Sequence, residues 1–199
     1  MKGTVLFLPG FQKRSFNALE KAEAIKPFLE NRGWQVEVSN YGHGRPMNLP
    51  ISIYLEELRS EFEQIRPKAV VAHSLGGILV RCLIEINRMR GIERLVMLES
   101  PHNGVPSWLL RIFGYPNWPV IWEVKKGSKL LAHLNSASRG EVDTRYCQIG
   151  GVLATIAPGI FKMSGAYVKD FPGVTHSGLR TNPLVLEEIA RFIERRTHD

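Results

Sequence analysis

The chain has 199 residues, of which 44% are hydrophobic and 23% are charged. This supplies enough apolar material for one substantial core and argues against an intrinsically disordered chain. The 26 Lys and Arg residues exceed the 19 Asp and Glu residues, giving a formal net charge of +7. The basic residues are spread along the chain rather than gathered in an arm, so no nucleic-acid partner is expected. No window holds the roughly 18 apolar residues that a transmembrane helix needs, and two cysteines are too few to cross-link a fold of this size.

The N-terminus does not have the pattern of a targeting segment. Thr4–Leu8 is a short β-rich run that Pro9-Gly10 closes, which indicates a buried strand entering a turn. A secretory signal would need a longer apolar stretch and a small-residue cleavage site. We therefore expect a cytoplasmic protein.

Strand-like and helix-like patterns then alternate along residues 1–199, without a repeat or linker that would divide them into two domains. The candidate strands are Thr4–Leu8, Gln35–Ser39, Ala69–Ala72, Leu95–Leu98, Tyr146–Ile149 and Ala166–Val168. Several are almost wholly apolar, as expected of strands that are covered on both faces.

Helical patterns lie between the candidate strands. One apolar stripe recurs at four- and three-residue steps at Ile51, Leu55, Leu58, Phe62 and Ile65. Asn182-Pro183 places a cap and a first-turn proline before a C-terminal helix. An earlier helix is predicted to open at Asn17 and to be kinked or split at Pro27. Strands that alternate with helices predict a single α/β domain, with a mostly parallel six-stranded sheet and helices on both faces.

The segment Val105–Val124 departs from this alternation. It contains Trp108, Trp118 and Trp122 among many other apolar residues, and its prolines prevent a single long helix. Such a long apolar connection is often a lid or binding loop, although it could also simply pack on the core. We expect residues 103–140 to form a lid or cap insertion.

The strongest functional signal is the sequence Ala72-His73-Ser74-Leu75-Gly76-Gly77, in which a buried strand ends and a helix begins. This is the setting of the G-x-S-x-G nucleophile elbow, with alanine in place of the first glycine. Ser74 would project its hydroxyl above the sheet at a helix N-terminus, where backbone N–H groups favour developing negative charge. The N–H of Leu75 would be one donor of an oxyanion hole.

From these residues the chain resembles the α/β-hydrolase superfamily, specifically the small bacterial lipases and lipase-like esterases. Phe7-Leu8-Pro9-Gly10-Phe11 is similar to the family's oxyanion loop, with Leu8-Pro9 in place of the usual histidine. The resemblance implies that the N–H of Phe11 is the second oxyanion donor. Ser100–Gly104 resembles the segment that often precedes the lid of these lipases, which supports the same family resemblance.

Six histidines are candidates for the general base. His176 lies in the loop between the last strand and the last helix, where the order of a serine triad places its histidine. The surrounding Gly173–Leu179 also resembles small bacterial lipases. His73 belongs to the elbow, but its side chain is expected to point away from the nucleophile. We therefore predict that His176 is the base.

The acid of the triad is harder to assign. The family usually carries an aspartate after the strand that corresponds to Tyr146–Ile149, and alignment on Pro158 puts Leu153 at that position. Glu99, at the end of the preceding strand, is one replacement, because pancreatic-type lipases are similar in carrying their acid there. Asp170 is a second replacement, and a dyad or a degraded, inactive site is a third interpretation. Glu99 could instead pair with an arginine such as Arg94 or Arg111.

The predicted function is hydrolysis of carboxyl esters, with Ser74 as nucleophile, His176 as base and Glu99 as acid. Trp108, Phe113 and Trp118 are expected to bind the acyl chain of a small-molecule or lipid ester. The sequence calls for no cofactor and contains no metal-ligand spacing. A thioesterase, amidase or acyltransferase on the same scaffold is an alternative, as is a catalytically silent protein that binds a lipid or protein partner. The positive charge also makes an anionic membrane surface a candidate partner.

Overall fold

The computed structural model describes residues 1–11, 18–42, 46–112, 114, 117–137 and 145–195. Its centre is a six-stranded sheet in the order β2-β1-β3-β4-β5-β6, in which every neighbouring pair is parallel. The strands are β1 (Thr4–Leu8), β2 (Gln35–Val38), β3 (Ala69–His73), β4 (Arg94–Leu98), β5 (Tyr146–Gly150) and β6 (Tyr167–Asp170).

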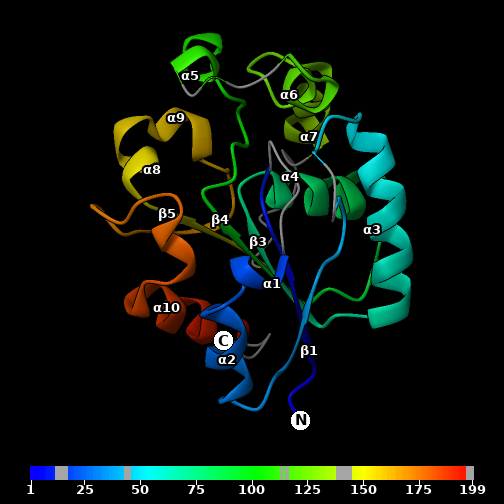
Figure 1. Cartoon of the computed structure of the whole chain (residues 1–199), viewed down its shortest axis with the longest axis vertical. Coiled ribbons are helices and arrows are strands. Elements are labelled where there is room, and N and C mark those ends of the chain that lie inside the picture. The colour runs from blue at the N-terminus through cyan, green and yellow to red at the C-terminus, as the bar shows by residue number, and fades with distance from the viewer. Residues whose placement is uncertain (12–17, 43–45, 113, 115–116, 138–144, 196–199) are drawn as a thin grey trace.

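Helices cover both faces of this sheet (Figure 1). The longer ones are α3 (Ile51–Ile65), α4 (Leu75–Arg81), which continues as a π-helical turn over Cys82–Ile86, α7 (Lys129–Ala137) and α10 (Pro183–Ile193). The shorter ones are α1 (Ala18–Lys21), α2 (Ile25–Glu30), α5 (Ser107–Ile112), α6 (Pro119–Glu123), α8 (Val152–Ile156), α9 (Pro158–Phe161) and a 3₁₀ turn over Gly178–Arg180.

Alternate residues of the central strands pack into two separate hydrophobic cores, one on each face of the sheet. Leu6 and Leu8 of β1 pack with α3 and α4 on one face, whereas Val5 and Phe7 pack with α2 and α10 on the other. Because successive strand side chains point to opposite faces, a strand that is covered on both sides must be apolar throughout. This explains why β1, β3, β4 and β5 are fully or almost fully buried and mostly apolar, while the edge strand β6 is largely exposed.

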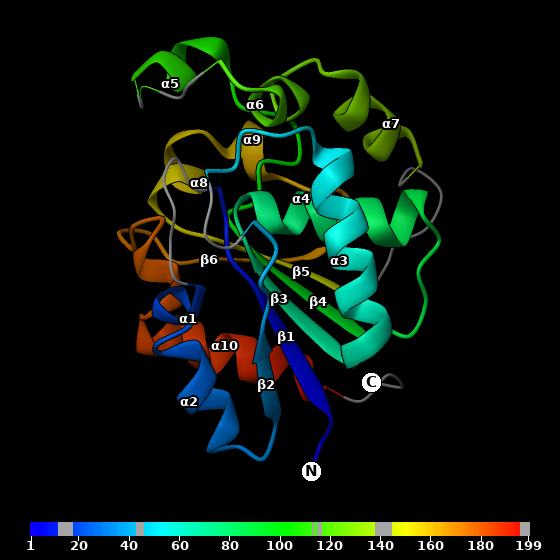
Figure 2. The ribbon, with the colours of Figure 1, turned by 45° about the vertical axis from the view of Figure 1, so that its right-hand side comes forward.

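Helices α5 to α9 gather beyond the end of the sheet at which the strands finish (Figure 2). The excursion that contains α5 and α6 is closed at its base by backbone hydrogen bonds of Val105. Val105 N–H donates to the Val124 carbonyl at 3.0 Å, and Lys126 N–H donates to the Val105 carbonyl at 3.0 Å. Within the described ranges, no helix has the length and apolar character that crossing a membrane requires.

The predicted α/β class, the six parallel strands and the helices on both faces are confirmed. The last helix begins as expected, because the Asn182 side chain accepts hydrogen bonds from the Leu184 and Val185 N–H groups. The early helical region is split, but at residues 22–24 rather than at Pro27. Pro27 is the third residue of α2, within the first turn, where its missing N–H breaks no helical hydrogen bond. Asn17 lies outside the described residues.

The start of α4 lies directly against the end of β1. A Cβ placed on Gly76 would come 2.8 Å from the Pro9 carbonyl oxygen and 3.0 Å from that of Leu8. Both are backbone atoms, which cannot rotate away as the end of a side chain can. Gly76 therefore allows the helix that follows Ser74 to approach the loop that follows β1.

We predict that Gly76→Ala lowers the free energy of unfolding by about 1–3 kcal/mol, the usual cost of overpacking a tight interior. Gly159→Ala is the matched control, because the new Cβ would meet nothing within 4 Å in the short helix α9. The control should be neutral or stabilising by up to about 1 kcal/mol. Urea denaturation measures both changes, and equal stability of the two variants would contradict the close approach.

Candidate active site

A cavity of about 190 Å³ lies where the ends of β1 and β3 meet. These neighbours form the switch point of the sheet, because the chain leaves β1 towards β2 and returns on its other side to β3. Loops diverge at a switch point, so ligands of open parallel sheets bind there, beyond the carboxyl ends of the strands. The cavity is lined by Gly10, Phe11, Lys21, His73, Ser74, His176, Ser177 and Arg180.

Ser74 occupies a strained turn between β3 and α4. Its φ of 53° and ψ of −119° lie in a region that non-glycine residues rarely adopt. The turn is held in place because Ser74 N–H donates to the Leu98 carbonyl at 2.8 Å and Gly77 N–H donates to the Ser74 carbonyl at 3.2 Å. The structure therefore has the sharp strand-to-helix turn that the sequence predicts, with Ser74 lining the cavity.

Glu99 and His176 come together although they are far apart in the sequence. Oε2 of Glu99 lies 2.7 Å from Nδ1 of His176. The Glu99 side chain is fully buried, whereas the His176 side chain is 31% exposed towards the cavity. A carboxylate accepts hydrogen bonds, so Nδ1 carries the proton in this contact and Nε2 is left free to act as a base.

The second oxygen of Glu99 is held by the loop that follows β5. Oε1 accepts hydrogen bonds from the N–H groups of Gly151, at 2.8 Å, and Ala154, at 2.9 Å, around the start of α8. Burial alone would raise the pKa of Glu99, but the hydrogen bonds from His176, Ala154 and Gly151 outweigh burial and lower it. The loop that carries Leu153 in place of an aspartate thus donates N–H groups to a carboxylate from the neighbouring strand.

The structure places the other acid candidate elsewhere. Asp170 is exposed at the end of β6, beside Gly150, and the contact to Nδ1 of His176 is made by Glu99. Arg94 does not pair with Glu99, since its guanidinium donates to the carbonyls of Glu93 and Arg195.

The expectation that His73 points away from the nucleophile is wrong. His73 lines the same cavity as Ser74, and its ring centroid lies 4.3 Å from that of His176. Its Nε2 lies 2.9 Å from the His176 carbonyl oxygen, and because a carbonyl only accepts, Nε2 is the donor. Burial, and then the neighbouring His176, hold the pKa of His73 well below its usual value. His73 is therefore a neutral side chain that fixes the backbone of the His176 loop.

The loop after β1 passes close to Ser74. A Cβ on Gly10 would lie 2.8 Å from Cβ of Ser74, so this position admits only glycine without displacement. The Tyr41 hydroxyl donates to the Pro9 carbonyl and fixes the loop from the other side. The peptide between Gly10 and Phe11 and the N–H of Leu75, the first residue of α4, accordingly flank the serine.

The predicted acyl-chain residues do not lie together. Trp118 reaches the site indirectly, because its ring centroid lies 5.9 Å from that of Phe11. Trp108 is 57% exposed on α5 and does not line the cavity at Ser74. Phe113 lies outside the described residues. A separate groove of about 320 Å³ runs between α5 and α6, with Leu110, Ile121 and Trp122 in its wall.

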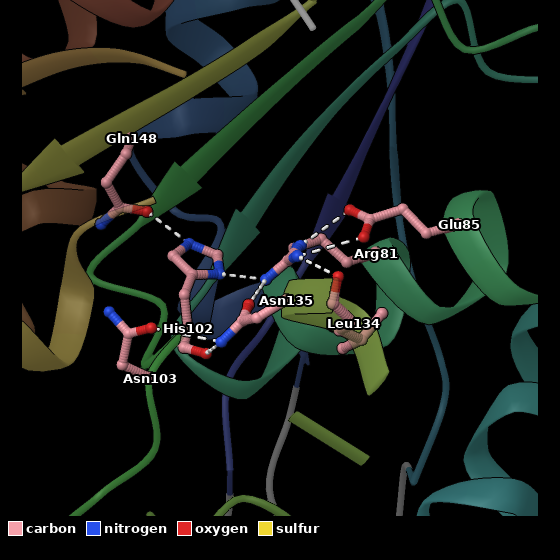
Figure 3. A network of polar contacts seen from close by, with 7 residues as sticks. All are labelled: Arg81, Glu85, His102, Asn103, Leu134, Asn135 and Gln148. Atoms are coloured by element: carbon pink, nitrogen blue, oxygen red, sulfur yellow. Dashed lines mark hydrogen bonds and ion pairs between the residues drawn. The ribbon is translucent and has the colours of Figure 1, made fainter. Parts of the chain in front are cut away.

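A buried polar network anchors the segment that leads into α5 (Figure 3). Arg81 is fully buried and forms a two-point ion pair with Glu85, at 2.8 and 3.1 Å. Its Nη1 donates to Nδ1 of His102 at 3.1 Å, so Nε2 of His102 donates to the Gln148 side chain at 2.8 Å. Burial, with Arg81 adding to it, lowers the pKa of His102 to about 3. His102 is thus a neutral structural residue.

The sequence interpretation missed several contributors to the site. The Arg81–Gln148 network, Tyr41 and the two cations of the cavity, Lys21 and Arg180, carry no recognisable motif. For Arg81 in α4 and Gln148 in β5, the available signal is a polar residue within an otherwise apolar element. In the described part of the chain, no three His, Cys, Asp or Glu residues are grouped as metal ligands.

Comparisons with known proteins agree with this architecture. No protein-family model matches the sequence, and no curated protein does either. Solved structures do match. The bromoperoxidase from Bacillus anthracis has a TM-score of 0.71 and 13% identity, over 97% of this chain and 92% of that one.

The propeptide form of the Bacillus licheniformis lipase BlEst2 has a TM-score of 0.70 and 15% identity, over 98% of this chain but 50% of that one. The monoacylglycerol lipase of Paleococcus ferrophilus has a TM-score of 0.59 and 14% identity, over 96% and 92% of the two chains. The chain therefore has the α/β-hydrolase fold.

We predict that Glu99 makes the stability of the protein sensitive to acid. Its folded-state pKa lies below that of an unfolded glutamate, about 4.3, so its ionised contacts stabilise the fold above that pH. This contribution is lost as the pH falls through the folded-state pKa.

Urea denaturation of wild type and Glu99→Gln between pH 7 and about pH 3.5 measures this effect. The stability advantage of the wild type should shrink towards the acid end. An advantage that stayed constant with pH would contradict the lowered pKa.

Proposed function

We propose that the protein is a serine hydrolase that cleaves carboxyl esters through an acyl-enzyme on Ser74. The proposal rests on one arrangement. The buried Glu99 carboxylate contacts Nδ1 of His176, and His176 lines the same cavity as Ser74, whose backbone is strained. Serine is a weak nucleophile by itself, and this arrangement of acid, imidazole and hydroxyl is the one that activates it.

In the first half of the reaction, Oγ of Ser74 attacks the ester carbonyl while Nε2 of His176 accepts the hydroxyl proton. Glu99 keeps the Nδ1–H tautomer and stabilises the imidazolium that forms. The N–H groups of Phe11 and Leu75 donate to the oxyanion. The protonated His176 then gives its proton to the leaving alcohol, and the acyl-enzyme remains.

In the second half, Nε2 of His176 accepts a proton from water, and the resulting hydroxide attacks the acyl carbonyl. The same N–H groups hold the second oxyanion. Collapse of this intermediate returns the proton to Oγ of Ser74 and releases the carboxylic acid. No step requires a further prosthetic group.

One alternative is a catalytically silent binding protein. It is favoured by Leu153, which stands where the family usually carries the acid. Glu99 makes the contact to His176 that an aspartate from that loop would make, so the support for a degraded site is weaker. A thioesterase, amidase or acyltransferase would use the same groups, and no observation favours one of them over ester hydrolysis.

We predict that a fluorophosphonate probe forms one covalent adduct, located on Ser74 and absent from Ser74→Ala. Intact mass and peptide mapping measure it. Ser177→Ala is the matched control, because Ser177 lines the same cavity and should leave labelling in place. Failure to label folded wild-type protein, with or without detergent, would contradict an activated nucleophile.

We further propose that residues 103–140 form a cap over the site, with the groove between α5 and α6 receiving the apolar part of the substrate. Two observations support this: α5 and α6 lie beyond the ends of the strands, and the Trp118 ring packs beside Phe11. Trp118 thereby connects the cap to the peptide that would stabilise the oxyanion.

We predict that Trp118→Ala lowers kcat/KM for acetate and decanoate esters alike, by about tenfold, because a displaced Phe11 impairs every substrate. Trp122→Ser should affect decanoate more than acetate, because Trp122 lines the groove between α5 and α6 and lies outside the cavity at Ser74. A panel of 4-nitrophenyl esters measures both. Equal chain-length profiles for the two variants would count against these separate roles.

A further inference from the structure

The cavity at Ser74 is strongly polar and carries two cationic side chains. Among its lining residues, Phe11 supplies the one apolar side chain, and Lys21 and Arg180 supply formal positive charge. No Asp or Glu of the described chain lines this cavity. The Glu99 side chain contacts His176 but is itself fully buried. This composition is unlike the apolar lining that a neutral acyl chain would favour.

Lys21 and Arg180 bring positive charge to the cavity without an acidic partner among the described residues. Several basic residues elsewhere form ion pairs, as in Lys26–Glu30, Arg32–Glu187 and Lys68–Glu93. Within the described ranges neither Lys21 nor Arg180 forms one. Their charges therefore remain available to a bound molecule.

The position of Arg180 is fixed by the fold. It ends the 3₁₀ turn that follows the His176 loop, and its Nη1 donates to the Lys21 carbonyl at the end of α1, at 2.9 Å. Its Nε is buried and has no hydrogen-bond partner in the described part of the chain. The guanidinium therefore keeps N–H donor capacity that no described residue satisfies.

The electrostatics agree with this placement. Burial lowers the pKa of Arg180, and Glu23, which is exposed and does not line the cavity, opposes the shift. Arg180 and Lys21 both act on His73 and lower its pKa, after burial and His176. The positive charges of the two side chains therefore act on His73, which lines the cavity.

We propose that the preferred substrates are esters that carry an anionic group a few bonds from the ester carbonyl, a carboxylate in the simplest case, which Lys21 and Arg180 bind while the carbonyl lies at Ser74. The proposal rests on the function proposed above and names its substrate class. Because the cavity is small, a carbonyl at Ser74 and an anion at Arg180 must be only a few bonds apart. Arginine suits a carboxylate because its planar N–H donors match the two oxygens.

The test uses two matched pairs of esters with the intact protein. In the first, the 4-nitrophenyl monoester of glutaric acid is compared with the ester whose terminal carboxylate is replaced by a carboxamide. In the second, 4-acetoxybenzoate is compared with 4-acetoxybenzamide, which moves the charge to the alcohol side. The wild type should prefer the anionic member of at least one pair by about tenfold in kcat/KM.

Lys21→Gln and Arg180→Gln should each reduce that preference, whereas Arg180→Lys, which keeps the charge, should restore part of it. Arg59→Gln is the matched control, because Arg59 lies on the exposed face of α3 and pairs with Glu63. Thermal unfolding identifies any variant that fails to fold, and Lys21→Gln then carries the test alone. No preference in the wild type, or a preference that survives both Lys21→Gln and Arg180→Gln, would overturn the proposal.

Failure of the proposed function is recognised separately. If the wild type neither hydrolyses the esters nor reacts with the fluorophosphonate, monomethyl glutarate is titrated into it by calorimetry. Binding that weakens in Lys21→Gln and in Arg180→Gln would support an anion site in a protein that is not an ester hydrolase. Absence of binding would overturn the inference as well.

Discussion

The buried Glu99 carboxylate is the interaction on which the geometry of the site depends. One oxygen holds Nδ1 of His176, and the other is held by two N–H groups at the start of α8. A buried carboxylate is tolerated only when its hydrogen bonds replace lost hydration, and three donors do so here. The three elements that meet at this carboxylate are the ends of β4 and β5 and the loop before α10. Removing it would leave the His176 ring without an orienting partner and the two N–H groups at the start of α8 without their acceptor.

The parallel sheet brings these residues together. Its strands all end at one edge, so Phe11, Ser74, Glu99 and Gly151, which follow four different strands, emerge side by side. Two of these positions, Ser74 and Glu99, have positive φ values of 53° and 44°. Backbone strain of this kind persists only where the surrounding packing determines the conformation. The close approach of Gly76 to the end of β1 and of Gly10 to Ser74 supplies such packing.

The features that the sequence predicts well are local. An apolar run followed by small residues around Ser74 specifies a strand, a tight turn and a helix within a few residues. The alternation of such units then specifies a parallel sheet and the side on which the strands end. The sequence offers both Glu99 and Asp170 as the acid but does not decide between them. The decision depends on which of the two side chains points inward at its strand end. Leu153 marks a lost acid, but no local pattern tells where its replacement lies.

The features that escaped prediction depend on packing between distant segments. Lys21 and Arg180 reach one cavity because α1 and the turn after His176 are joined through the Arg180–Lys21 hydrogen bond. Tyr41 and Arg81 likewise act on residues far from them in the chain. His73 ends β3 on the same face as Ala69 and Val71, and the sequence does not show that the His176 loop packs against that end of the strand. For Arg81, a polar residue inside an apolar helix is the sequence signal for such a contact, but it does not identify the partner.

We propose that Glu99, and not Asp170, is the acid that serves His176 in an ester hydrolase. The most direct test is the kcat of Glu99→Gln and Asp170→Asn on 4-nitrophenyl acetate, beside the wild type. We predict a loss of about 10⁴-fold in Glu99→Gln, the size seen when an amide replaces the acid of a serine triad, and little change in Asp170→Asn. A large loss in Asp170→Asn with near-normal turnover in Glu99→Gln would contradict it.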